Sequence, residues 1–304
     1  MPRPLATLML LVTTMLWGFA FVAQKSAMDT MGPLTFAAVR YALGGIVILP
    51  LVAWEYRRRR AQVTPGDWRL ILLLSLAFFL GVYLQQAGLT TTTVTNGGFL
   101  TSLYVLFVPL IALLAVQQKP HPIVWIGMPM AVFGVFLLNG GHLDRFNLGD
   151  LMVIGSAVCW AVQVLLLGHL ARSTGLPITV SAACFLLTAM LSAAGAFAFE
   201  APAGSAIAAD WVQLLYTGVL STAVAFSMQA IGQQYVPPAN AAIVLSAESL
   251  FAALGGAVVL GERLPPVGYA GAALIFVAIV LVEIVPVVME RRADRAAAAI
   301  AKPS

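Results

Sequence analysis

Ten stretches of about 20 mostly apolar residues follow one another along the chain, and they constrain its fold more than any other feature. A helix of that length crosses a hydrocarbon core of roughly 30 Å. Apolar residues make up 61% of the 304 residues and charged residues 9%, against about 25% in soluble domains. The sequence therefore predicts an all-α polytopic membrane protein with the lipid bilayer as its partner. The expected spans are residues 5–24, 33–54, 69–88, 95–116, 123–140, 150–169, 177–199, 211–233, 238–260 and 266–288.

The second half of the chain repeats the first at an offset of 144 residues. Each half has five spans, so the second half crosses the membrane in the opposite sense, which is an inverted-topology repeat. We expect one repeat at 1–140, another at 148–288, and a disordered cytoplasmic tail at 289–304. The aligned identical pairs are Pro33 and Pro177, Thr35 and Thr179, Gln85 and Gln229, Gly88 and Gly232, Asn96 and Asn240, Phe107 and Phe251, and Gly127 and Gly271.

The basic residues predict how the chain is inserted, because cytoplasmic loops are enriched in Lys and Arg. With a cytoplasmic N-terminus, the outer side holds only Lys25, Arg145 and Arg263, and both termini are cytoplasmic. The net charge of +4 then reflects topology in the cell (inner) membrane and not a nucleic-acid partner. The basic residues expected on the cytoplasmic side are Arg3, Arg57, Arg58, Arg59, Arg60, Arg69, Lys119, Arg172, Arg291, Arg292, Arg295 and Lys302.

Four segments resemble the EamA branch of the drug/metabolite transporter superfamily. They are LWGFAFVAQK (16–25), PLTFAAVRYALGG (33–45), NGGFLTSLYVLFVPL (96–110) and STAVAFSMQAIGQQYVPPANAAIVLSAESLFAALGGAVVLGERL (221–264). The resemblance implies ten helices in two inverted five-helix repeats, with helices 1–4 and 6–9 around a central cavity and helices 5 and 10 outside it. It also implies export of small metabolites, often amino acids.

Three basic or acidic residues within or at the ends of spans are candidates for substrate binding or coupling. A charge inside a membrane is costly and usually faces a protein interior. Glu248 is either a partner for a substrate ammonium or a coupling proton, or a hydrogen-bonding anchor between helices. Arg40 either binds a substrate carboxylate in a bidentate fork or pairs with a buried acid. Lys25 either faces the cavity or extends to the membrane interface.

Amide and aromatic side chains inside the spans form the second set of candidates. The amides suit zwitterionic or neutral polar solutes, or they hydrogen-bond one helix to another. The aromatic rings wall a cavity, or they pack helices. These candidates are Gln85, Gln163, Gln229, Asn96, Asn240, Trp17, Trp160, Tyr83 and Tyr104.

The sequence favours a secondary transporter that exports small polar metabolites by alternating access. It has no G-x-x-x-x-G-K-[ST], H-E-x-x-H or G-x-S-x-G motif, and His121, His142 and His169 are scattered, so we expect no enzyme activity, cofactor or metal. Protons are a possible coupling ion, and the expected assembly is a monomer or a homodimer. The alternative is a membrane partner or sensor protein without transport of its own, and a membrane-embedded enzyme is a remote third.

Overall fold

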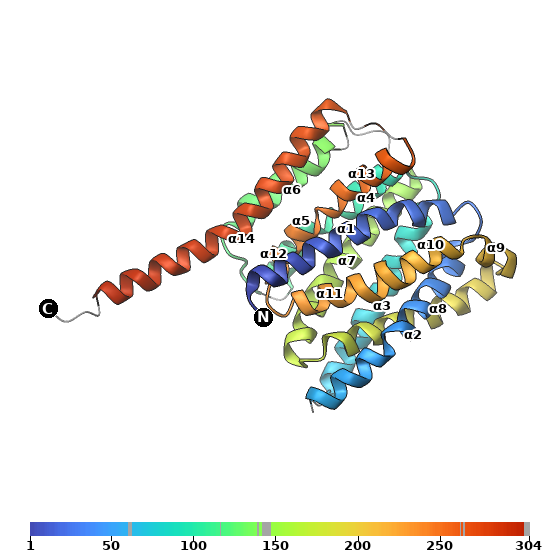
Figure 1. Ribbon diagram of the computed structural model, residues 1–304, viewed down its shortest axis with the longest axis horizontal. Helices are drawn as coiled ribbons and strands as arrows, with labels where there is room; N and C mark the ends of the chain where they lie inside the picture. The colour runs from blue at the N-terminus through green and yellow to red at the C-terminus, as the bar shows by residue number, and fades with distance from the viewer. Residues whose placement is uncertain are drawn as a thin grey trace.

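The computed structural model describes residues 1–59, 63–115, 117–138, 140–141, 147–261, 263 and 265–300. The described regular structure is helical (Figure 1). Several helices begin at a proline, whose fixed φ suits the first helical turn and whose missing N–H is not needed there. The helices are α1 Arg3–Ala27, α2 Pro33–Arg59, α3 Pro65–Gly88, α4 Val94–Thr101, α5 Tyr104–Leu114, α6 Val124–Leu138, α7 Leu148–Ser173, α8 Pro177–Phe199, α9 Gly204–Ala209, α10 Trp211–Leu215, η1 Tyr216–Val224, α11 Ala225–Gly232, α12 Pro238–Leu245, α13 Glu248–Val259 and α14 Pro266–Ile300.

The prediction of an all-helical membrane protein is confirmed. Nine helical stretches among the described residues are long and apolar enough to span a bilayer, and α6 is a shorter apolar helix. Three of the nine consist of more than one segment: α4 with α5, α10 with η1 and α11, and α12 with α13. The 15 residues of α6 rise about 22 Å, less than the expected 123–140 would give. The short α9 lies where the sequence predicted a loop.

The fourth and ninth spans are each interrupted by a turn where the sequence predicted continuous helix. The turns begin at Ser102 and Ser246, which are equivalent at the offset of 144. Each serine hydroxyl donates to a carbonyl of the preceding turn, Gly98 O at 2.8 Å and Ile243 O at 2.7 Å. Such side-chain bonds compete with regular helix geometry. Ser102 Oγ also lies 3.5 Å from Ser246 O, so the two interruptions meet.

The last span of each repeat lies outside the central bundle, as the resemblance implies. Figure 1 shows α6 and α14 side by side, with the C-terminal part of α14 projecting away from the other helices. Gly134 and Gly271 allow this pair to approach closely, because a Cβ on Gly134 would lie 2.9 Å from the Gly271 carbonyl oxygen.

The antiparallel helices α2 and α8 join the two repeats, and each caps the other with a carboxylate. Glu55, near the end of α2, accepts from Ile178 N at 3.2 Å and from Thr179 N and Oγ1, each at 2.8 Å. Glu200, which follows α8, accepts from Leu34 N and from Thr35 N and Oγ1 at the start of α2. The first N–H groups of a helix have no partner within the helix, and a carboxylate there is also favoured by the helix dipole.

The structure buries more carboxylates than the sequence analysis singled out. Glu55, Asp150 and Asp210 are each buried, as Glu248 is. All three of these additional acids serve helix ends or connections: Asp150 accepts from Thr92 and caps α7, and Asp210 accepts from Thr30. These three acids are thus structural in this fold.

Parts of the sequence predictions lie outside the described residues. Of the segments that resemble the EamA branch, Glu262 and Leu264 are outside them, and so is His142. The helix α14 continues to Ile300, whereas the sequence predicted disorder from residue 289. The membrane orientation stays a prediction. Some of the basic residues on which this orientation rests are outside the described residues, either entirely or in their side chains. They are Arg59, Arg60, Arg145, Arg291, Arg292, Arg295 and Lys302.

We predict that Glu55→Gln lowers the apparent melting temperature of the purified protein. The substitution removes the charge from a buried cap and turns an amide NH₂ toward backbone donors, at a cost of about 1.5–3 kcal/mol. The control is Glu283→Gln, which breaks the partly exposed ion pair with Arg3 and costs at most about 1 kcal/mol. Thermal unfolding in detergent measures both. Equal shifts for the two variants would contradict the role of the cap.

Candidate functional site

A small cavity lies at the centre of the helical bundle, between the two repeats. The space open to the centres of water-sized molecules is about 40 Å³, enough for about three waters. Each repeat contributes, and α6 and α14 contribute nothing among the described residues. The cavity is lined by Trp17, Phe21, Gln24, Arg40, Tyr41, Val82, Gln85, Gln86, Thr101, Tyr104, Trp160, Gln163, Val164, Ser221, Phe226, Gln229, Leu245 and Glu248.

Helical periodicity brings the lining residues of α1 to one face. Trp17, Phe21 and Gln24 follow the spacing i, i+4, i+7, which places them above one another. Gly18, beside this face, lets α1 approach the start of α13, since a Cβ there would lie 2.7 Å from the Glu248 carbonyl oxygen. The close packing of α1 thus depends on a residue without a side chain.

Arg40 lies in the cavity wall with 5% of its surface exposed and with only neutral hydrogen-bond acceptors. Its Nε donates to Thr222 Oγ1 at 3.0 Å, Nη1 to Gln24 Oε1 at 2.9 Å, and Nη2 to Ser221 Oγ at 3.0 Å. The Tyr41 ring centroid is 5.0 Å from the guanidinium carbon. The ion pairs found among the described residues do not include Arg40. Pairing with a buried acid, one of the two roles expected for Arg40, is therefore not found among the described residues.

A π-helical segment, η1, supplies two of the three acceptors of Arg40, and it was not predicted from the sequence. π-Helical turns are rare in proteins, and those that occur often lie at functional sites. Ser221 lies in η1, and its carbonyl also accepts from Trp17 Nε1 at 2.9 Å. Gly44 and Gly218 let α2 and η1 touch, because a Cβ on Gly44 would lie 2.9 Å from Gly218 O. The close contact of the two backbones thus brings the hydroxyls of Thr222 and Ser221 within reach of the guanidinium.

The amide side chains in the wall mostly bond to one another. Gln163 and Gln229 exchange two hydrogen bonds, of 3.0 and 3.2 Å. Trp160 Nε1 donates to Gln85 Oε1 at 2.7 Å, and Gln85 Nε2 donates to Gln24 Oε1 at 3.3 Å. The sequence left two roles open for the amides, solute binding and hydrogen bonding between helices. The structure contains the hydrogen bonds between helices.

Glu248 lines the same cavity as these amides, together with hydrogen-bonding groups that lack partners among the described residues. Its side chain is 3% exposed. Glu248 Oε1, Tyr104 Oη and Thr101 Oγ1 are buried and have no hydrogen-bond partner among the described residues. The Tyr104 hydroxyl is close enough to interact with the Glu248 carboxylate, but no hydrogen bond of normal geometry joins them. Buried polar groups without partners are rare in proteins and point to a missing water or ligand.

Aromatic rings close the cavity on its apolar side. Trp17 and Phe226 have centroids 4.6 Å apart, and Phe78 lies behind them, 5.0 Å from Phe226 and 5.3 Å from Trp160. The two tryptophans therefore pack into a ring cluster and also line the cavity, so both of the roles expected for them are compatible with the structure.

Four sequence candidates lie away from the cavity in the described part of the chain. Lys25 Nζ donates to the carbonyls of Leu89 at 2.7 Å and Thr90 at 3.2 Å, at the end of α3. Asn96 Nδ2 donates to Asp150 Oδ1 at 2.6 Å. Tyr83 is half-buried and does not line the cavity.

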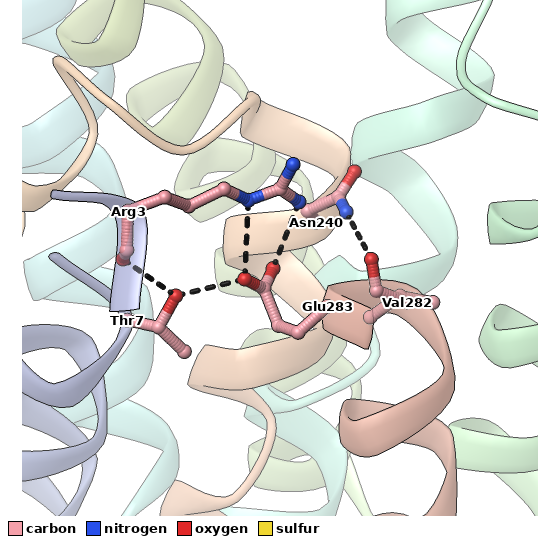
Figure 2. Close-up of polar contacts among 5 residues, drawn as sticks. All are labelled: Arg3, Thr7, Asn240, Val282 and Glu283. Carbon is pink, nitrogen blue, oxygen red and sulfur yellow. Dashed lines mark hydrogen bonds and ion pairs between the residues drawn. The ribbon is translucent and has the colours of Figure 1, made fainter. Parts of the chain in front are cut away.

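The fourth, Asn240, ties α12 to the outer helix α14. Figure 2 shows its amide donating to Val282 O, at 2.7 Å. The adjacent Glu283 accepts from Arg3 Nε at 3.3 Å and from Thr7 Oγ1 at 2.8 Å. These contacts hold α14 against the bundle, which gives Asn240 a place in the fold rather than in the cavity.

The cavity wall includes Gln24, Tyr41, Thr101 and Ser221, which were not predicted from the sequence. Gln24 had a usable signal, because it lies seven residues after Trp17 and therefore on the same helix face. Ser221 had none, since its position depends on the π-helical segment. In the described part of the chain no group of three or more His, Cys, Asp or Glu side chains is placed to hold a metal ion.

Comparisons with known proteins cover nearly the whole chain. The model of the EamA-like transporter family matches residues 4–140 and again residues 147–284. An uncharacterized transporter of Archaeoglobus fulgidus is 32% identical over 286 residues, which are 93% of this chain and 87% of the relative. The threonine/homoserine exporter RhtA of Escherichia coli K12 is 27% identical over 254 residues, 80% of this chain and 79% of the relative. A protein of known crystal structure has a TM-score of 0.74 and 21% identity, over 92% of this chain and 97% of that one, which indicates the same fold.

We predict that Gly44→Ala destabilises the protein and displaces Arg40. The added Cβ would lie 2.5 Å from Thr222 Cγ2, so α2 and η1 must separate, at a cost of about 1–3 kcal/mol. Thermal unfolding of the purified variant measures the loss. Gly204→Ala is the matched control, because nothing lies within 4 Å of a Cβ at that glycine. An unchanged melting temperature for Gly44→Ala would refute the close contact.

Proposed function

Because the chain belongs to the EamA-like transporter family, we propose that it is a secondary transporter that exports small polar metabolites, such as amino acids and related compounds. Transport proceeds by alternating access, with the central cavity opening to one side of the membrane and then to the other. In this proposal the termini are cytoplasmic, and protons are a candidate for the coupling ion.

The observation that supports this proposal is the presence of two opposite, separately held charges in one cavity. Arg40 and Glu248 both line it, and no ion pair joins them. An isolated charge at the centre of a membrane costs several kcal/mol, so such residues usually mark a substrate or ion pathway. A cavity that holds both residues can bind a charged or polar group of a small solute, and a sensor or assembly partner does not require such a cavity.

The architecture supports the alternating-access part of the proposal. The cavity lies between two repeats that belong to the same family, and it has room for only about three waters in this conformation. A solute larger than that requires the wall to move. Export as the direction is supported by the relative RhtA, which is named as a threonine/homoserine exporter.

Efflux from proteoliposomes tests the proposal. Vesicles with purified protein are loaded with a mixture of cytosolic metabolites, and mass spectrometry identifies the compounds that leave, with and without a pH gradient. We expect selective loss of a few small polar compounds relative to protein-free vesicles. If no compound leaves under either condition, the transport proposal fails and a partner or sensor role takes its place.

We predict that Glu248→Gln lowers efflux at least tenfold with little change in folded yield. The amide keeps the shape of the side chain but removes the negative charge from the cavity, and hydrogen bonds to charged groups are worth about 1.5–3 kcal/mol. The control is Glu283→Gln, which removes a carboxylate outside the cavity. Loss of folded yield with normal flux per folded molecule would instead identify Glu248 as a structural anchor.

A further inference from the structure

We propose that the cavity recognises its substrate by a protonated amine, which Glu248, Tyr104 and Thr101 bind, and that Arg40 does not clamp a carboxylate. This inference presupposes the transport function proposed above and specifies the chemical group that the site selects.

Some polar groups of the cavity wall have hydrogen-bond partners among the described residues, and others have none. The amides of Gln163 and Gln229 bond to each other, and Gln85 bonds to Trp160 and Gln24. The lining oxygens that are buried without a partner, among the residues that the structure describes, are Thr101 Oγ1, Tyr104 Oη and Glu248 Oε1. This part of the wall therefore has hydrogen-bonding capacity that a water or a ligand can use.

The chemistry of these three groups defines the ligand. A carboxylate only accepts hydrogen bonds, and the two hydroxyls can accept as well as donate. An ammonium has three N–H donors and no acceptor, so three oxygens match it in number and in sign. Glu248 is the first residue of α13, where the helix dipole favours the negative charge with which an ammonium would pair.

The fold places the three groups together through its internal repeat. Thr101 is the last residue of α4 and Tyr104 the first of α5, so the interruption of the fourth span positions both. Tyr104 and Glu248 are 144 residues apart, which makes them equivalent in the two repeats. Because the interruptions of the fourth and ninth spans meet at Ser102 and Ser246, these equivalent positions converge on one subsite.

Arg40 uses three of its five N–H groups in hydrogen bonds within the protein, including the Nε–H on which a side-on fork depends. A bidentate contact uses two parallel N–H groups of one guanidinium edge. Each nitrogen of Arg40 already donates, to Thr222, Gln24 or Ser221. Arg40 is therefore a positioning residue that orients Gln24 and supplies a positive charge to the cavity, and a substrate carboxylate is not required for binding.

Binding of matched probes to the purified protein tests this inference. The probes are L-threonine, its amino alcohol L-threoninol, and N-acetyl-L-threonine. The readouts are the intrinsic tryptophan fluorescence, to which Trp17 and Trp160 of the cavity contribute, and the melting temperature. We expect the Kd values of threonine and threoninol to agree within about threefold, and N-acetylthreonine to bind at least tenfold more weakly. The proposal would be overturned if N-acetylthreonine bound as tightly as threonine, or if threoninol alone did not bind. Absence of binding by all three would also count against it.

Conservative variants distinguish the subsite from general stability. Tyr104→Phe and Thr101→Val each remove one oxygen and should weaken amine binding about three- to tenfold while the N-acetyl probe is unaffected. Thr188→Val is the matched control, because Thr188 Oγ1 is also buried without a partner among the described residues but does not line the cavity. Unchanged amine binding in both cavity variants would mean that these hydroxyls hold water only.

The efflux experiment separates this inference from the transport proposal. If the compounds that leave the vesicles lack an amine, the amine subsite is refuted and the transport function stands. If nothing leaves, the transport function itself fails.

Discussion

The docking of α2 against α8 is the interaction on which the rest of the structure depends. In a membrane the backbone groups at helix ends need partners, and Glu55 and Glu200 supply them across the repeat boundary at both ends of the pair. The caps fix the register of the two helices. That register determines where Arg40 lies along α2 and hence which acceptors of η1 it reaches. Without this docking the acceptors of Arg40 in η1 would no longer be held beside α2, and this part of the cavity wall would be lost.

The two repeats share a fold but differ in the chemistry of equivalent positions. At the offset of 144 residues Gln85 corresponds to Gln229, and both line the cavity. Arg40, however, corresponds to Cys184, and Glu248 corresponds to Tyr104. Each repeat therefore contributes one charge, at a different place. A symmetric pair of arginines or glutamates would repel across a small cavity, whereas this arrangement gives a site with two different ends.

The wall of the cavity combines rigidity with unused binding capacity. The amide pairs and the tryptophan donors hold neighbouring helices together at modest energy, since hydrogen bonds between membrane helices average about 0.6 kcal/mol. The oxygens near Glu248 lack such partners. In the proposed transporter, this contrast would distinguish groups that organise the site from groups that are available to a solute. The glycine contacts at Gly18 and Gly44 keep both sets in place.

The sequence by itself determined the number and type of the spans, the repeat and the family, because apolar length, periodicity and a constant offset are local or pairwise properties of the chain. It also identified Arg40 and Glu248, since charge inside an apolar span is visible without coordinates. Tertiary structure alone decided which polar residues share the cavity. Asn96 and Asn240 have the same sequence signature as Gln85 and Gln229, yet they bond to Asp150 and to Val282 at helix ends. These partners lie on helices that are far apart in the sequence from each asparagine, so only the packing of the helices shows them.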